Sequence, residues 1–208
     1  MTEHAYQFGP LGSLTGILNY PDGVDPEAPV AIILNAGIVH RVGPFRLHVD
    51  LARALASRGV ASLRMDLSGL GDSETRRDLP EGVDRAKLDV DDAMSALEES
   101  HDIRQFVLIG LCSGAYNAHQ VCVADPRVVG GVFMDGVVFE TPEHKRRMLK
   151  RRLRYRFLRN AVKKRLDPNA LHSDENSDSA EFFTNDKPAW EIAGEVEAML
   201  RREMQLLF

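Results

Sequence analysis

The chain has 208 residues, a hydrophobic fraction of 44% and a formal net charge of −5, values typical of one domain with a sizeable core. No apolar run approaches the roughly 20 residues of a membrane-spanning helix, and the first residues do not form a signal peptide. Two cysteines are too few for a disulfide framework, so we expect a cytoplasmic protein.

Strand-like and helix-like segments alternate through the first two thirds of the chain. The expected strands cover residues 13–20, 30–35, 60–66, 105–110 and 128–136. The expected helices cover residues 45–58 and 83–99, and a third begins just after residue 112. Continuous apolar runs such as VAIILN are typical of strands that a parallel sheet buries on both faces. The alternation predicts a three-layer α/β fold with a mostly parallel sheet.

A strongly basic segment follows residue 136, where the alternation stops. Between Lys145 and Arg165 there are 12 Lys and Arg and no acidic residue, which leaves 14 basic against 31 acidic residues elsewhere. Leu149, Leu153 and Phe157 recur at helical spacing, so this segment is expected to form an amphipathic helix with a cationic face.

Helix and strand patterns return near the end of the sequence. Residues 189–203 have a helical pattern, and MQLLF resembles the first residues of a further buried strand. We therefore predict a core at residues 1–136, a helical insertion at 137–190 and a return to the core at 191–208.

A cysteine and a serine stand side by side in GLCSGA, at the junction of an expected strand and helix. Glycine two positions before and after a nucleophile permits the sharp turn that lifts the nucleophile above a sheet edge. Gly110 and Gly114 have this spacing around Cys112, whereas centring the pattern on Ser113 would place Leu111 where a small residue is required. Cys112 is therefore the expected nucleophile rather than a buried structural cysteine. Ser113 is expected to contribute its backbone N–H to an oxyanion hole.

Three blocks of the sequence resemble the α/β-hydrolase family. The elbow GLCSGA is one, and IILNAG followed by LARALASRGVASLRMD is similar to the family's third strand, first helix and fourth strand. The block Asp66-x-x-Gly69-x-Gly71-x-Ser73 resembles the family's D-x-x-G-x-G-x-S turn. The resemblance covers residues 13–136 and implies an α/β-hydrolase fold with an inserted basic lid. The combination of NAGIVHRVGP, the elbow and a basic cap further resembles a bacterial subgroup, the exosortase-system-associated hydrolases.

The resemblance also implies roles for individual residues. Gly37 matches the glycine of the family's His-Gly oxyanion motif, with Ala36 in place of the histidine, so Ile38 would supply the second oxyanion N–H. Asp135, after its strand, matches a position that supplies the triad acid in a minority of the family. The commoner acid and the triad histidine would follow later strands, beyond Phe208, so the last strands of the fold are expected to be missing.

Alternatives remain for two of the expected site residues. His40 lies close to the expected oxyanion loop and either lines the site beside Gly37 or is a polar loop residue bonded to backbone. Asp135 is either the triad acid or an aspartate that caps a helix or anchors a loop.

The other histidines and the second cysteine are weaker candidates. His144 and His172 follow the nucleophile in the sequence, as a triad base would, but they lie in the expected lid. His119 is expected to be solvated on the helix after the elbow, and Cys122 is expected to pack in the core as a small apolar residue.

The expected activity is hydrolysis of an ester or thioester through an acyl-Cys112 intermediate. The alternatives are an acyltransferase of the same fold and a non-catalytic binding or accessory protein. SGLGDSE lacks the third glycine of a dinucleotide loop, and no phosphate-loop motif or clustered metal site is present in the sequence, so we expect no cofactor.

The expected partner is a small-molecule acyl substrate. The basic segment Lys145–Arg165 is either a solvated lid face or a contact for anionic lipid headgroups or an acidic partner. One basic helix with few aromatic residues does not form a nucleic-acid recognition module, so we expect no nucleic acid. The oligomeric state is left open.

Overall fold

The computed structural model describes residues 2–25, 27–76, 84–136, 138–139, 184–185 and 189–207. The chain divides into two compact units, Met1–Val137 with Ala193–Phe208, and Val138–Ile192. In the second unit, β7 (Val138–Phe139) and β8 (Thr184–Asn185) pair in parallel. All candidate site residues named above that lie within the described residues belong to the first unit.

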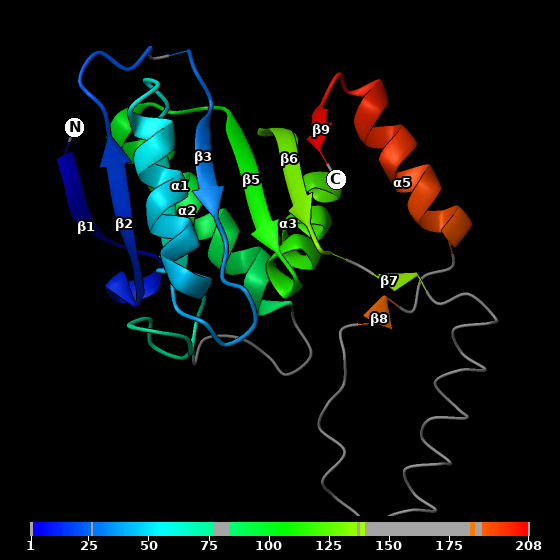
Figure 1. The fold of residues 1–208 in the computed structure, drawn as a ribbon, viewed down its shortest axis with the longest axis horizontal. Helices are drawn as coiled ribbons and strands as arrows, with labels where there is room; N and C mark the ends of the chain where they lie inside the picture. Colours follow the sequence, from blue (N-terminus) through cyan, green and yellow to red (C-terminus); the bar gives the residue numbers. More distant parts are fainter. Residues whose placement is uncertain are drawn as a thin grey trace, which may run out of the picture. The chain divides into compact units, whose positions relative to one another are not determined.

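The first unit is built on a seven-stranded sheet with the order β1-β2-β4-β3-β5-β6-β9 (Figure 1). Strands β1 and β2 are antiparallel to each other, β2 is antiparallel to β4, and the remaining neighbours are parallel. The strands are β1 (Thr2–Phe8), β2 (Leu14–Tyr20), β3 (Val30–Ile33), β4 (Ser62–Asp66), β5 (Phe106–Leu111), β6 (Val128–Met134) and β9 (Gln205–Leu207). The expectation of a mostly parallel sheet is confirmed.

Helices cover both faces of this sheet, which gives the expected three layers. In Figure 1, α1 crosses in front of the strands while α2 and α3 lie behind them. The helices are α1 (Leu47–Ala56), α2 (Arg85–His101), α3 (Ser113–Ala124) and α5 (Ala189–Arg201), with two short 3-10 turns, η1 (Pro10–Gly12) and η2 (Pro44–Arg46).

Two apolar clusters of unequal size fill the layers. The larger cluster takes residues from six strands and from α2, α3 and α5, and it extends along the sequence from Phe8 to Met204. The smaller cluster lies under α1 and centres on Ala31, Ile33, Ala52 and Ile109. Side chains of β3 alternate between the two clusters, as expected for a strand that is buried on both faces.

The sheet face under α1 is polar on the side of β1, β2 and β4. Glu3, Asn19 and Ser62 lie in register across these three strands. Asn19, Ser62 and Arg64 are buried, and Glu3 forms ion pairs with Arg53 of α1 at 2.8 Å and with Arg64 at 3.7 Å. Burial lowers the pKa of Arg64, because a buried guanidinium loses its hydration.

Most expected elements lie within a few residues of the observed ones, although one helix begins later than expected and one strand was not expected. The expected helix at 45–58 begins only at Leu47, because Phe45 and Arg46 have φ angles of 50° and 65°, outside the helical region. Strand β1 was not expected. It forms the sheet edge, and its residues from Thr2 to Ala5 are exposed, so its seven paired positions carry little apolar pattern.

The predicted lid helix Lys145–Arg165, together with His144 and His172, lies outside the described residues. The expected strand in MQLLF is confirmed as β9, which pairs with β6, although Gln205 and Leu207 are exposed rather than buried. Among the described residues, no helix is long and apolar enough to cross a membrane.

The larger cluster should dominate the stability of the first unit. Replacing the fully buried Leu63 of β4 by alanine leaves a cavity in the core and should lower the free energy of unfolding by about 2–5 kcal/mol. The matched change Leu200→Ala affects a side chain that is more than half exposed and should cost less than about 0.5 kcal/mol. Urea denaturation measures both, and equal losses would contradict this account of the core.

Candidate active site

The candidate residues gather at one edge of the sheet. Strands β3, β4, β5 and β6 run parallel, so their carboxyl ends meet at this edge. Asp66 ends β4, Cys112 directly follows β5, and Asp135 directly follows β6. The loop that contains Gly37 and Ile38 follows β3. The loop after β3, the turn after β4 and the elbow after β5 therefore meet at this edge.

Cys112 occupies a sharp turn between β5 and α3. Its φ and ψ angles are 55° and −120°, a region that non-glycine residues rarely adopt and that costs about 1–3 kcal/mol. Its N–H donates to the carbonyl of Met134 in β6 at 2.9 Å, and its thiol is exposed. Such strain is common at functional positions, where the surrounding structure holds a side chain in one place.

The two glycines of the elbow are required by the space around them. A Cβ at Gly110 would lie 2.2 Å from the backbone of Gly114, and a Cβ at Gly114 would lie 2.4 Å from the carbonyl oxygen of Asn35. Both obstacles are backbone atoms and cannot rotate away. The glycine spacing that selected Cys112 from the sequence is therefore a steric requirement of this turn.

The Ser113 hydroxyl joins the elbow to the loop after β3. The backbone N–H of Gly37 donates to Ser113 Oγ at 2.7 Å. Ser113 is itself buried at the first position of α3. The expectation that Ser113 contributes through its backbone therefore omitted its side chain, which makes a contact of its own.

The loop after β3 is a tight two-residue turn. Ala36 and Val39 form a β-bridge, and the N–H of Val39 donates to the carbonyl of Ala36 at 3.1 Å. Gly37, at the first central position, has a φ of 58°, which glycine adopts without strain. At the second central position, Ile38 has a side chain that is 89% exposed, and its N–H donates to no protein group among the described residues.

The fully buried carboxylate of Asp66 holds this loop from the other side. Asp66 Oδ1 accepts from Asn35 Nδ2 at 3.1 Å and from the Arg41 N–H at 2.5 Å. Asp66 Oδ2 accepts from the Arg41 guanidinium and from the Asp72 N–H at 3.1 Å. A Cβ at Gly71 would lie 2.2 Å from Asp66 Oδ2, which explains this glycine of the D-x-x-G-x-G-x-S block.

Arg41 connects the loop to the turn after β4. Its guanidinium contacts Asp66 and also bonds Asp72 Oδ2 at 2.5 Å. Burial alone lowers the pKa of Arg41, but the hydrogen bonds to Asp72 and Asp66 outweigh burial and raise it. Arg41 is therefore a permanently charged partner for a carboxylate that water does not reach.

Asn35 and Arg41 were not identified from the sequence. Asn35 donates to Val39 O at 2.9 Å and accepts from the Leu67 N–H at 2.7 Å, so it fixes both the loop and the end of β4. The feature of the sequence that could have indicated them is Asp66 at the end of an expected buried strand, because a buried carboxylate requires a charged or hydrogen-bonding partner. The sequence did not indicate which residue supplies it.

Asp135 and His40 lie at the same edge of the sheet, and in the part of the chain that the structure describes neither side chain has a hydrogen bond or ion pair. Asp135 is exposed and has a φ of 47°, and Met134 before it lies in register with Leu111 before Cys112. His40 is exposed, and its carbonyl accepts from the N–H of Gly43. Among the described residues, no histidine bonds Cys112 or Asp135.

Two residues on α3 lie away from this edge. His119 is 6% exposed, so the expectation of a solvated histidine is wrong. It packs against Phe133 with ring centroids 5.8 Å apart, and its Nε2 lies 3.9 Å from Glu195 Oε2 of α5. Cys122 is fully buried in the larger cluster, as expected, and burial raises the pKa of its thiol to about 12.

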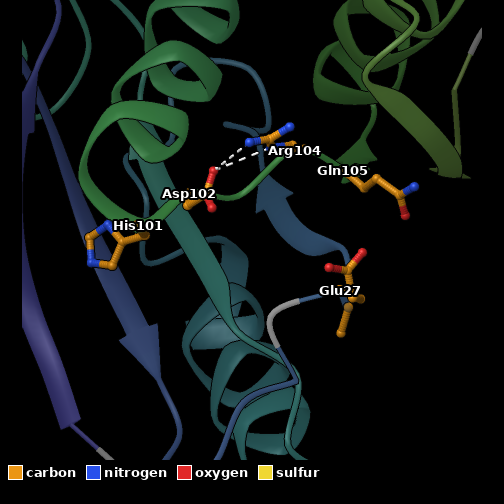
Figure 2. A pocket seen from close by; sticks show the side chains of 6 residues that line it. Glu27, His101, Asp102, Arg104 and Gln105 are labelled. Atoms are coloured by element: carbon orange, nitrogen blue, oxygen red, sulfur yellow. Dashed lines mark hydrogen bonds and ion pairs between the residues drawn. The ribbon is translucent and has the colours of Figure 1, made fainter.

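A surface hollow of about 420 Å³ lies at the opposite end of the sheet. Figure 2 shows its charged and polar lining, in which Arg104 bonds Asp102 at 3.1 Å. Ala28 precedes β3 and Gln105 precedes β5, so this hollow lies at the amino ends of the strands, far from the end that carries Cys112. It is not the candidate active site.

The steric account of the elbow predicts the effect of adding one methyl group. Gly114→Ala should lower the free energy of unfolding by about 1–3 kcal/mol, because the new Cβ collides with the Asn35 carbonyl. Gly194→Ala in α5 meets no atom within 4 Å and should be neutral or stabilising by up to about 1 kcal/mol. Urea denaturation compares the two, and a neutral Gly114→Ala would contradict the steric limit of the turn.

The two thiols should differ sharply in reactivity. In the folded protein an aromatic disulfide reagent should modify only Cys112 rapidly, because Cys122 is buried and the raised pKa of its thiol keeps it protonated. Both thiols should react after unfolding in denaturant. Cys112→Ala should remove the rapid phase, and two rapid thiols in the folded wild type would contradict the burial of Cys122.

Several solved structures are similar to this chain in fold. The esterase Pf2001 of Pyrococcus furiosus has a TM-score of 0.56 at 17% identity, and the match covers 66% of this chain and 52% of the esterase. The hydrolase GrgF of Penicillium sp. sh18 has a TM-score of 0.54 at 21% identity, with 78% and 56% covered. DcsB, solved with a substrate analogue, has a TM-score of 0.54 at 17% identity, with 77% and 54% covered.

These likenesses show a shared fold, and the chain spans about half the length of the solved structures that it matches. A search of curated proteins found no match. The model of the alpha/beta hydrolase family matches residues 36–206, a range that contains the loop after β3, the turn after β4 and the elbow. The chain therefore belongs to the alpha/beta hydrolase family.

Proposed function

We propose that this chain is a hydrolase that cleaves an ester or thioester through a covalent acyl intermediate on Cys112. The observation that carries the proposal is the elbow. An exposed thiol stands at a strained backbone position between β5 and α3, and both flanking glycines are sterically required. A turn of this kind presents a nucleophile above the sheet edge and aims the first N–H of the helix at the reacting atoms.

The proposed acylation step uses groups at the same edge of the sheet. The Cys112 thiolate attacks the carbonyl carbon, the C–S bond forms, and the carbonyl oxygen becomes an oxyanion. The N–H groups of Ile38 and Ser113 would donate to that oxyanion, and one such donor is worth about 10²–10³ in kcat in comparable sites. The bond to the leaving group then breaks, and water attacks the acyl-cysteine to release the acid.

A general base is needed to take the thiol proton and later to activate water. The proposal places a histidine in this role, with Asp135 as the acid that orients it. The support for Asp135 is that it directly follows β6, next to Met134, whose carbonyl accepts the hydrogen bond of the Cys112 N–H. The histidine itself is not assigned. Gly37 and His40 are proposed as lining residues.

Two other activities share parts of this site. An acyltransferase would form the same acyl-Cys112 and pass it to an acceptor other than water. A non-catalytic accessory protein would keep the fold without a base, and the lack of a histidine bonded to Cys112 among the described residues favours this second candidate.

We further propose that the chain belongs near the exosortase-system-associated hydrolases. The support is the pair of motifs NAGIVHRVGP and GLCSGA, which form the two sides of the site. The basic segment Lys145–Arg165 is proposed as a lid face that contacts an anionic surface or an acidic partner, and it lies outside the described residues.

Acyl transfer from p-nitrophenyl acetate tests the nucleophile. The wild type should gain one acetyl group on Cys112, seen by intact mass and peptide mapping, with release of p-nitrophenol. Cys112→Ala should lose the adduct and at least about 10³ in kcat/KM, as expected when a covalent nucleophile is removed.

Cys112→Ser is the matched control, because it keeps a nucleophilic atom at the same position. Adding a small alcohol separates hydrolysis from acyl transfer through the products formed. An unchanged acetyl adduct in Cys112→Ala would refute the assignment of the nucleophile.

A further inference from the structure

We propose that the side chain of Ser113 is a positioning residue: its hydroxyl holds the loop after β3 so that the Ile38 N–H faces the oxyanion. The inference rests on the proposed function, because it concerns the geometry of that same oxyanion hole. It assigns Ser113 a side-chain role in addition to the backbone N–H considered above.

The N–H groups of the turn have different partners. The Gly37 N–H donates to Ser113 Oγ at 2.7 Å, and the Val39 N–H donates to Ala36 O at 3.1 Å. Of the two central residues of the turn, Gly37 is bonded in this way, and the Ile38 N–H has no protein acceptor among the described residues. The Ser113 hydroxyl therefore engages the Gly37 N–H, and the Ile38 N–H is left to donate to a substrate.

The direction of the Ile38 N–H depends on the contacts that hold the central turn. The Asp66 carboxylate fixes the two ends of the loop through Asn35 and Arg41. Neither contact reaches the central turn at Gly37 and Ile38. Among the described residues, the side chain that bonds the central turn is the Ser113 hydroxyl, which comes from the residue next to Cys112.

The Ser113 hydroxyl is buried. Ser113 is 6% exposed, so its hydrogen bond to Gly37 has little competition from water. Removing the hydroxyl would leave the Gly37 N–H without its acceptor and free the central turn to shift. An oxyanion donor must lie within about 2.7–3.1 Å of the developing charge, so a small shift weakens transition-state binding more than substrate binding.

The test compares two reactions of the same thiol in the folded full chain at alkaline pH, where thiols ionise without a histidine. Acylation by p-nitrophenyl acetate forms a C–S bond, passes through an oxyanion and expels p-nitrophenolate. Alkylation by iodoacetamide displaces iodide at a saturated carbon and forms no oxyanion. A positioning role should therefore affect only the first reaction.

Ser113→Ala should slow acylation of Cys112 by at least about tenfold, less than the 10²–10³ of a deleted donor, and leave alkylation unchanged. The loss should fall on the acylation rate constant rather than on KM. Ser113→Thr keeps the hydroxyl and should recover most of the rate. Ser57→Ala, a matched change on an exposed serine after α1, should alter neither reaction.

The outcomes separate the two proposals. If Ser113→Ala is acylated as fast as the wild type, the positioning role is overturned while the nucleophile assignment stands. If acylation and alkylation slow together, the substitution disturbs Cys112 itself and the positioning role is also overturned. If the wild type is not acylated on Cys112, the proposed function fails and this inference fails with it.

Discussion

The carboxylate of Asp66 is the interaction on which the candidate active site depends. It is fully buried and accepts four hydrogen bonds, from Asn35, from the backbone and guanidinium of Arg41, and from the Asp72 backbone. An unpaired charge in this position would cost several kcal/mol. The donors come from the loop after β3 and the turn after β4, so satisfying one carboxylate fixes both segments at the end of the sheet. The role of the Asp66 carboxylate is therefore to position the loop after β3 and the turn after β4, and we assign it no step of the proposed reaction.

From Asp66 a continuous path of contacts leads to Cys112. Asn35 and Arg41 hold the ends of the loop, Gly37 in its centre bonds the Ser113 hydroxyl, and Ser113 is the neighbour of Cys112. Cys112 in turn donates to Met134, which joins the elbow to β6. The strained backbone of the elbow is thus held from several directions, as the positive φ angle of Cys112 requires. Cys112 and the loop after β3 therefore belong to one connected assembly.

How much of this could be predicted depended on whether the physical cause is local. The parallel strands appear as apolar runs because both of their faces are buried. The elbow appears as a pair of glycines in the sequence, although only the clash avoided at Gly110, with the backbone of Gly114, is local, and the clash avoided at Gly114 is with the distant Asn35 carbonyl. The edge strand β1 carries no such pattern. The Arg41–Asp66 pair joins residues 25 positions apart, and the burial of His119 depends on α5, which contributes Glu195 from much later in the chain. Pairings of this kind are set by tertiary geometry, which the sequence alone did not reveal.

The unequal clusters on the two faces of the sheet also bear on how the protein forms during synthesis. The cluster under α1 draws its members from Ala31 to Met134, so it can assemble once β6 has left the ribosome. The larger cluster includes both Phe8 and Met204, residues separated by nearly the whole chain. Contacts between such distant residues close slowly, and until they close the apolar faces of α2 and α3 lack part of their cover. During synthesis, the face of the sheet under α2 and α3 therefore stays incompletely covered for longer than the face under α1.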